Sequence, residues 1–280
     1  MSASVATAKA NPITTRRVLV GLLVAAIGIS TIFVPWLFYM LILVIGLMSL
    51  YELNALCEMK GQPLEYPVAV FGVAAYILLA AVGRLHTWEG VLLAGVTIAS
   101  FSIGMYGEQQ GYFARTAYTL LAVLYIGKLL SYFVFIRKVP DVGMFWTIYV
   151  VVLIALTDIF GMLVGTLIGR HQLTRISPRK TVEGSLGALL IVTGVAALGA
   201  LWLPLHLMWW QGMAAGFLTS IAAQAGDLAE SALKRDVGVK DTGTVIQGHG
   251  GVLDRFDSYL FGGMAFFGVL HLLGVMAVPQ

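Results

Sequence analysis

The stretch MFWTIYVVVLIALTDIFGMLVGTLI, residues 144–168, decides the fold. Its only charged side chain is that of Asp158. A helix needs about 20 mostly apolar residues to cross a bilayer, so this run predicts a membrane-spanning helix. A carboxylate inside such a helix is costly unless it faces a wet or protein-lined cavity. Asp158 is therefore the first candidate site residue.

The rest of the chain has the same apolar character. Of its 280 residues, 59% are hydrophobic and only 11% are charged, whereas soluble domains have about 25% charged residues. The mean hydropathy is +0.89. A soluble fold of this length cannot bury so much apolar surface. We therefore expect an integral membrane protein.

Similar apolar runs recur along the chain and predict an all-α, polytopic protein with about nine transmembrane helices, within a range of eight to ten. Only Pro35 and Trp36 mark a break between the first two runs. The first run is too long for the apolar core of a signal peptide, so we expect it to be retained. The expected spans are residues 17–35, 36–56, 67–83, 90–106, 113–136, 144–168, 185–203, 208–228 and 258–278.

The distribution of charge predicts three regions. We expect residues 1–15 to be a disordered cytoplasmic N-terminus, residues 16–143 a transmembrane scaffold, and residues 144–280 the catalytic transmembrane region. Lys128 is a rare ionisable residue within the apolar runs of the scaffold. It is predicted to snorkel to the interface or to pair with a lipid phosphate.

Basic residues predict the topology. Arg16 and Arg17 precede the first apolar run and are placed in the cytoplasm by the positive-inside rule. Nine spans then place the basic loops 169–184 and 229–257 on the cytoplasmic face as well. Arg137 and Lys138 fall on the outer side as exceptions. The compact length favours a bacterial inner membrane.

Three function classes are disfavoured. A net charge of +3 does not support nucleic-acid binding by electrostatics. The single cysteine, Cys57, excludes an internal disulfide framework and a cysteine-based zinc cluster. The chain has no GxxxxGK[ST] motif, which argues against a P-loop ATPase.

Glycines and polar residues gather around the 169–184 loop. Gly161, Gly165 and Gly169 recur every four residues, which predicts one small-residue helix face that packs closely against another helix. The loop segment ISPRKTVEG, residues 176–184, combines hydroxyls, cations and a helix start, which suits an anionic phosphate. An ordinary basic cytoplasmic loop is the alternative. The candidates are Ser177, Arg179, Lys180, Thr181 and Glu183.

A second polar segment is QAGDLAESALKRDVGVKDTGTVIQGHGGVLDRFDS, residues 224–258. Its first part places Asp227, Glu230, Ser231 and Lys234 on one stripe of a helix. Its glycine turn, residues 248–251, has backbone N–H groups that can form an anion-binding nest. Asp254, Arg255 and Asp257 follow. Asp257 could instead cap the last helix, and His249 could be an ordinary loop histidine.

Asp227 and Asp254 flank the glycine turn. Carboxylates accompanied by cations, without a Cys or His cluster, suit Mg²⁺, which prefers oxygen ligands. The residues therefore indicate phosphoryl or nucleotidyl transfer at a membrane surface, where the enzyme positions reactants and neutralises charge.

The segment from Ser231 to Asp257 resembles the signature of the phosphatidate cytidylyltransferases, also called CDP-diacylglycerol synthases. Gly226, Asp227, Glu230 and the segment 177–184 fit the same family, so the resemblance covers roughly residues 158–257. The matching signature positions are Ser231, Lys234, Arg235, Lys240, Asp241, Gly248, His249, Gly250, Gly251, Leu253, Asp254, Arg255 and Asp257.

The resemblance implies transfer of the cytidylyl group of CTP to phosphatidate, giving CDP-diacylglycerol and pyrophosphate for phospholipid biosynthesis. It makes Asp227 and Asp254 the Mg²⁺ ligands, and it suggests a homodimer among membrane lipids. The implied catalytic residues are Asp227, Asp254, Lys240, Asp241 and His249. The implied substrate-binding residues are Ser177, Arg179, Lys180, Thr181, Ser231, Lys234, Arg235, Gly248, Gly250, Gly251 and Arg255. Further candidates are Asp158, Glu183, Glu230 and Asp257.

Two positions depart from the family pattern. Gln247 stands where the family usually has proline, and Met162 stands where it usually has tyrosine. Both bear on the lipid acceptor, so a paralogue that uses a related lipid phosphate is an alternative. A CTP-dependent polyprenol or dolichol kinase is another. A transporter or scaffold is the non-enzymatic alternative, although a transporter would place its charges nearer the bilayer midplane.

Overall fold

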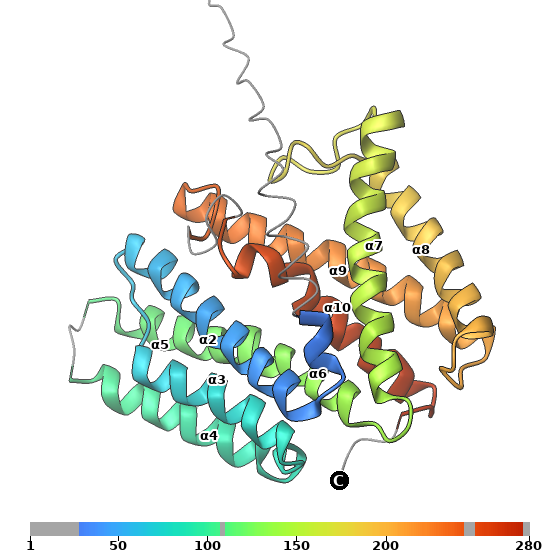
Figure 1. The fold of residues 1–280 in the computed structure, drawn as a ribbon. Helices are drawn as coiled ribbons and strands as arrows, with labels where there is room; N and C mark the ends of the chain where they lie inside the picture. Colours follow the sequence, from blue (N-terminus) through green and yellow to red (C-terminus); the bar gives the residue numbers. More distant parts are fainter. Residues whose placement is uncertain (1–27, 107–109, 244–249, 277–280) are drawn as a thin grey trace, which may run out of the picture.

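The computed structural model describes residues 28–106, 110–243 and 250–276, and within these ranges the chain is helical with no strand (Figure 1). The expected all-α architecture is confirmed. The elements are α2 (Pro35–Met59), α3 (Tyr66–Ala81), α4 (Leu85–Gly104), α5 (Tyr112–Ala122), the π-helix η1 (Val123–Lys128), α6 (Leu129–Lys138), α7 (Gly143–Ile168), α8 (Val182–Trp202), α9 (Trp209–Val237) and α10 (Leu253–Leu272).

Among the described residues, five helices are long and apolar enough to cross a membrane: α2, α4, the continuous α5–η1–α6 helix, α7 and α8. Helix α3 is apolar but shorter. The chain is thus a polytopic integral membrane protein. The count of nine spans stays a prediction, because most of the first expected span, residues 17–35, lies outside the described residues.

Two helix boundaries differ from the expected spans. Helix α9 continues past residue 228 to Val237, because its polar end is rich in Ala, Leu, Glu, Lys and Arg, which all favour helix. It ends at Gly238, which takes a left-handed conformation with φ of 80°. Helix α10 begins at Leu253, before the expected residue 258. The candidate residues expected in a loop beside the membrane therefore lie largely on helix ends.

Glycines allow α7, α8 and α9 to pack closely. For α7, the sequence predicted this from a face of small residues. A Cβ atom added at Gly184 of α8 would lie 2.5 Å from the carbonyl oxygen of Gly161 on α7. On the other side of α8, a Cβ at Gly216 of α9 would lie 2.2 Å from the Cβ of Ala196. The expected helix-packing role of the α7 glycines is confirmed, and it fixes the walls of the site described below.

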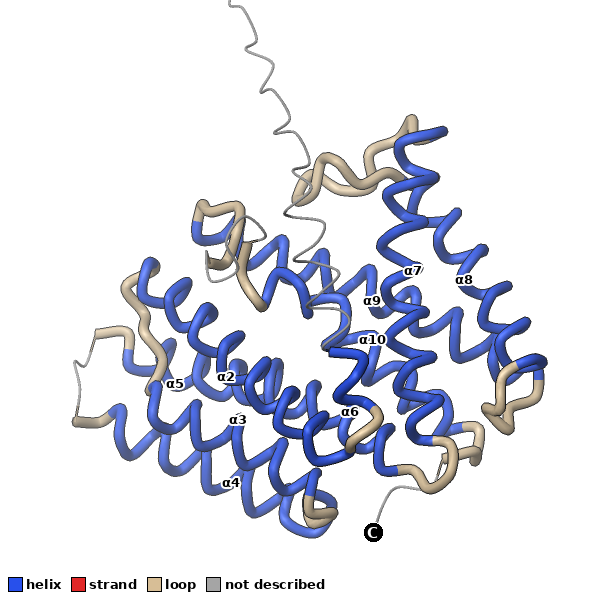
Figure 2. The backbone as a smooth tube through the Cα atoms, viewed as in Figure 1, coloured by secondary structure: helices blue, strands red, loops and turns tan. Residues whose placement is uncertain are grey.

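The remaining helices, α2–α6, form a second group beside α7–α10, and both α7 and α10 pack against α6 of this group (Figures 1 and 2). Lys128 of η1 pairs with Glu89 of α4 and lies 5.3 Å from the ring centre of Tyr132. Glu89 is thus an internal partner for Lys128, and the predicted snorkelling or pairing with a lipid phosphate stays a prediction. Lys60, after α2, pairs with Asp236 near the end of α9 and so ties the two groups together.

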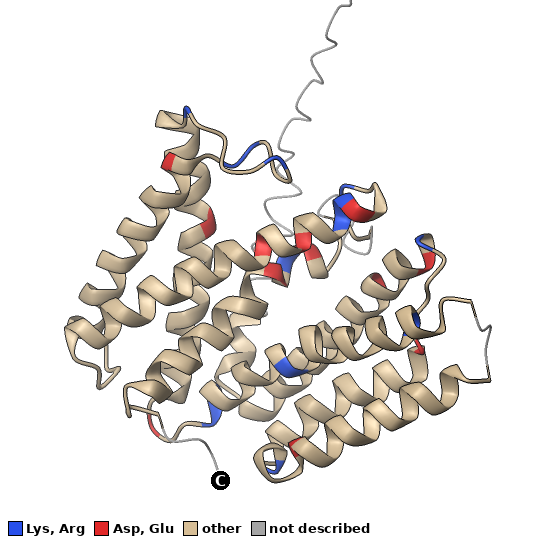
Figure 3. Ribbon diagram, turned by 180° about the vertical axis from the view of Figure 1, so that it is seen from behind, with Lys and Arg blue, Asp and Glu red and all other residues tan. Residues whose placement is uncertain are grey.

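The two polar loops meet at one end of the molecule. Arg235 Nε, at the end of α9, donates to the carbonyl oxygen of Ile176 in the 169–181 loop at 3.4 Å. Figure 3 shows charged residues of α9, α10 and this loop gathered on the same side of the helices. The described parts of the two polar segments therefore lie together, and their placement on the cytoplasmic face stays a prediction.

Candidate active site

A polar cavity of about 450 Å³ opens between α7, the 169–181 loop, the start of α8 and the middle of α9. This volume is within the range of about 300–1,000 Å³ that is usual for small-molecule sites. The cavity gathers predicted residues from two distant polar segments. Its lining includes Asp158, Met162, Ser177, Arg179, Lys180, Thr181, Ser185, Gln224 and Asp227.

Asp227 is the central carboxylate of this cavity. It forms an ion pair with Lys180, and its Oδ1 accepts a hydrogen bond from Ser231 at 3.4 Å, one helical turn further along α9. Asp158 of α7 also borders the cavity and accepts from Ser258 Oγ of α10 at 3.4 Å. Asp158 and Asp227 lie close enough for their charges to repel each other. Three helices thus bring polar side chains to one place.

The 169–181 loop is shaped by two of the predicted residues. The side chain of Thr181 caps α8 by accepting from the N–H of Gly184 at 3.1 Å. Glu183 accepts from the N–H groups of Arg170 at 3.0 Å and His171 at 3.2 Å. Glu183 therefore stabilises the backbone of the loop. None of its described contacts is with a residue that lines the cavity, so they do not support its predicted role in substrate binding or catalysis.

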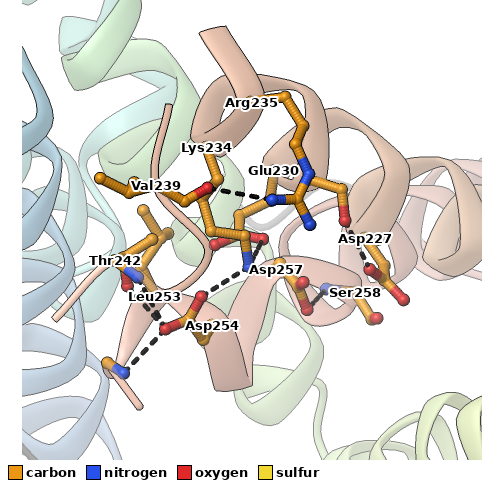
Figure 4. A network of polar contacts seen from close by, with 12 residues as sticks. Asp227, Glu230, Lys234, Arg235, Val239, Thr242, Leu253, Asp254, Asp257 and Ser258 are labelled. Carbon is orange, nitrogen blue, oxygen red and sulfur yellow. Dashed lines mark hydrogen bonds and ion pairs between the residues drawn. The ribbon is translucent and has the colours of Figure 1, made fainter. Parts of the chain in front are cut away.

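A second polar network lies between α9 and α10 (Figure 4). The ammonium of Lys234 lies 2.5 Å from Glu230 Oε2 and 2.7 Å from Asp254 Oδ1. The other oxygen of Asp254 accepts from Thr242 N at 2.9 Å, Thr242 Oγ1 at 3.0 Å and Gly251 N at 2.8 Å. Asp254 thereby connects α10 to the residues on both sides of the 244–249 segment.

The network of Glu230, Lys234 and Asp254 lies outside the expected transmembrane span 208–228. Burial shifts the pKa values of its side chains. Glu230 is fully buried, and burial followed by the nearby Asp254 carboxylate raises the pKa of Glu230. Burial alone would raise the pKa of Asp254 too, but Glu230, Lys234 and the backbone donors hold that pKa below its ordinary value. Lys234 is held charged, because its two carboxylate partners outweigh burial and raise its pKa.

Glu52 of α2 joins this network, although nothing in the sequence analysis singled it out. It is only 1% exposed. Its Oε1 accepts from Val252 N at 2.8 Å, and its Oε2 accepts from Leu253 N at 2.8 Å and from Thr242 Oγ1 at 3.1 Å. One signal could have found it: a lone carboxylate inside an expected span, residues 36–56, marks a functional or buried polar site.

The described half of the glycine turn, Gly250 and Gly251, packs against Asp254 and Glu52. Gly250 has φ of 83°, and a Cβ at Gly251 would lie 2.4 Å from Glu52 Oε2, so both positions require glycine. The N–H of Gly251 is already bonded to Asp254. Gly248, His249 and Gln247 lie outside the described residues, so the nest prediction is untested there.

Several candidates lie at the edge of the site. Asp257 does not cap α10, because the helix begins four positions earlier at Leu253; it is buried and accepts from Ser258 N at 2.6 Å. Arg235 donates to backbone carbonyls of the adjoining loops. The structure does not bring Lys240 and Asp241 into the networks above; these two residues and Arg255 are exposed.

The oxygen donors at the site suit a hard cation such as Mg²⁺. Asp227, Asp158 and Asp257 come from three helices, and Asp257 interacts electrostatically with both of the others. No group of three or more metal-binding side chains is preassembled in the described part of the chain. Mg²⁺ commonly uses one or two carboxylates and completes its shell with water and substrate phosphates. Asp227 lines the cavity, whereas the oxygens of Asp254 are bonded to Lys234, Thr242 and Gly251, so the assignment of these two residues as Mg²⁺ ligands stays a prediction.

Comparisons with known proteins agree on one family. The family model described as the cytidylyltransferase family matches residues 14–273. The phosphatidate cytidylyltransferase of Bacillus subtilis (strain 168) is 32% identical over 253 residues, which cover 88% of this chain and 93% of that protein. The enzyme of the same name from Staphylococcus haemolyticus (strain JCSC1435) is 32% identical over 239 residues, covering 84% and 88%. That of Staphylococcus aureus (strain COL) is 30% identical over 242 residues, covering 85% and 88%.

Proposed function

The chain belongs to the cytidylyltransferase family, and we propose on this premise that it transfers the cytidylyl group of CTP to phosphatidate. The products are CDP-diacylglycerol and pyrophosphate, and the process served is phospholipid biosynthesis. The observation that supports this best is the cavity in which Lys180 and Arg179 stand beside Asp227, next to the Lys234–Asp254 network. Cations and carboxylates side by side are what a reaction between two phosphate-bearing substrates needs.

Arg179, Lys180 and Ser177 bind the triphosphate in this proposal, because all three line the cavity and carry donors suited to phosphate oxygens. Lys180 already neutralises one carboxylate there. A phosphate oxygen of the lipid attacks the α-phosphorus of CTP, and the bond from that phosphorus to the bridging oxygen of pyrophosphate breaks. The cations reduce the repulsion between the two anionic substrates and stabilise the charge on the leaving group.

Asp227 and Asp254 hold Mg²⁺ in the proposed enzyme. The metal, when bound, neutralises phosphate charge and stabilises the pyrophosphate that leaves. Lys234 keeps Asp254 ionised and in place, since it contacts Oδ1 directly. Ser231 supports Asp227 in the same way through Oδ1. The chain's own residues therefore position the metal ligands as well as the nucleotide.

The lipid acceptor enters from the membrane in this proposal, past the apolar side of α7 where Met162 lines the cavity. Met162 cannot donate a hydrogen bond, so selection of the acceptor relies on the phosphate group and the apolar surroundings. The relatives are bacterial, which supports placement in a bacterial inner membrane with the site facing the cytoplasm and its CTP. A homodimer in the membrane completes the proposal.

Product identification tests the function. Purified protein in detergent receives CTP labelled at the α-phosphate, Mg²⁺ and phosphatidate. Label that moves to the lipid phase together with released pyrophosphate is the expected result. A folded protein that labels no lipid phosphate, but releases CDP with a polyprenol acceptor, is a lipid kinase and contradicts the proposal.

A further inference from the structure

We propose that Glu52 is a positioning residue for the active site: from α2, it fixes the start of α10 and the orientation of Asp254. This inference rests on the proposed function, because it assigns Asp254 to the same reaction. The structural basis is the set of three hydrogen bonds to a carboxylate that is only 1% exposed.

Glu52 holds both ends of the segment 244–249. It contacts Thr242 on one side, and Val252 and Leu253 on the other. These partners lie up to 201 positions away in sequence, so the contact is a tertiary one between the two helix groups. One carboxylate therefore links the stretch that follows α9 to the start of α10.

The contact reaches Asp254 by a short path. Thr242 Oγ1 lies 3.1 Å from Glu52 Oε2 and 3.0 Å from Asp254 Oδ2, so its single hydroxyl proton is shared between the two carboxylates. Leu253, whose N–H is bonded to Glu52, immediately precedes Asp254 in the first turn of α10. The positive end of the helix dipole favours a carboxylate at this place, which adds to the hydrogen bonds. Moving Glu52 would therefore move Asp254.

The geometry demands a carboxylate at this position. Each oxygen of Glu52 accepts from a backbone N–H, which can only donate, and Oε2 also faces the Thr242 hydroxyl. Glutamine has the same shape but offers one oxygen and a donating NH₂ group, so at least one N–H would face another donor. Aspartate keeps the charge but is shorter. Glu58, on the same helix, is exposed and accepts only from Asn54 in the described contacts, so it provides a matched control.

The test compares Glu52→Gln, Glu52→Asp and the control Glu58→Gln with the unmodified chain. Hydrogen–deuterium exchange is measured without metal or nucleotide, and the formation of labelled CDP-lipid is measured against Mg²⁺ concentration. In Glu52→Gln, we expect faster exchange within residues 240–257 but unchanged exchange within 143–168. We also expect the Mg²⁺ concentration for half-maximal rate to rise about tenfold, the lower end of typical effects of outer-shell changes. Glu58→Gln should match the unmodified chain, and Glu52→Asp should recover part of the loss.

Unchanged exchange at 240–257 together with unchanged Mg²⁺ dependence would overturn the inference. So would a loss of rate that only follows a loss of folded protein. If Glu52→Gln yields no monodisperse protein, Thr242→Val decides: a raised Mg²⁺ requirement supports the path through Thr242, and an unchanged one refutes it. Absence of product from both the unmodified chain and Glu58→Gln would instead refute the proposed function, while the exchange data would still judge Glu52.

Discussion

Replacing Lys234 by methionine tests the electrostatics of the network that holds Asp254. The change keeps much of the apolar stem but removes the ammonium that lies 2.5 Å from Glu230 and 2.7 Å from Asp254. The Lys234 side chain is 13% exposed, Asp254 is 9% exposed and Glu230 is not exposed at all. The variant therefore leaves two carboxyl groups side by side in a poorly solvated place.

Breaking a buried ion pair by removing one partner costs about 3–5 kcal/mol. Asp254 keeps its bonds to Thr242 and Gly251, so its share of the loss is partly offset. Glu230 has only one cationic partner among the described contacts, Lys234, and its other close neighbour is the Asp254 carboxyl group. We expect the lower end, about 3 kcal/mol, which corresponds to a fall in Tm of roughly 6 °C or more.

Thermal unfolding in detergent measures this loss, and the double variant Lys234→Met with Glu230→Gln provides the control. Removing the stranded charge should recover most of the stability. The loss should also shrink at lower pH: the pKa of Glu230 is raised, so the folded variant takes up a proton there and becomes less stable as pH rises through that pKa. A single variant as stable as the unmodified chain, or a double variant no better than the single one, would refute the reasoning.

Three further outcomes follow from the site and its walls. Asp254→Asn should abolish formation of labelled CDP-lipid while leaving a monodisperse protein, and full activity would remove Asp254 from the metal role. Lys180→Ala should raise the KM for CTP about tenfold or more, measured from initial rates, because a cation of the cavity is lost; an unchanged KM would place the triphosphate elsewhere. Gly184→Ala should lower Tm, because its new Cβ would lie 2.5 Å from the carbonyl oxygen of Gly161, whereas Gly194→Ala on the same helix meets open space and should be neutral or stabilising. Equal effects of the two alanines would contradict the packing argument.

The membrane helices could be predicted because hydropathy reports the solvent of a segment directly. Runs such as residues 144–168 stand out for that reason, and α7 begins and ends within one residue of the expected bounds. The end of α9 could not be found in this way. Its last turns leave the apolar environment, yet their helix-forming side chains continue the backbone hydrogen bonds to Val237. Hydropathy marks where a helix leaves the bilayer, and other forces decide where it ends.

The site was predictable where its residues are neighbours in sequence. The spacing of Asp227, Glu230 and Lys234 placed them on one helix, and the structure confirms that placement. Their partners in other elements follow no local period, so the pairing of Lys180 with Asp227 could not be derived from the spacing. Glu52 is the extreme case, because its bond partners at the start of α10, Val252 and Leu253, are 200 and 201 positions away.

The position of Glu52 also changes what the first half of the chain contributes. A scaffold that only filled the bilayer would need no charge at its inner face, and burying an unpaired carboxylate costs several kcal/mol. Glu52 is buried and fully paired, and its partners are the residues that orient Asp254. Lys60, which directly follows the C-terminal end of α2, pairs with Asp236 on α9. The two helix groups therefore meet through charged contacts at the catalytic end, which makes the geometry of the site depend on how α2 docks against α9 and α10.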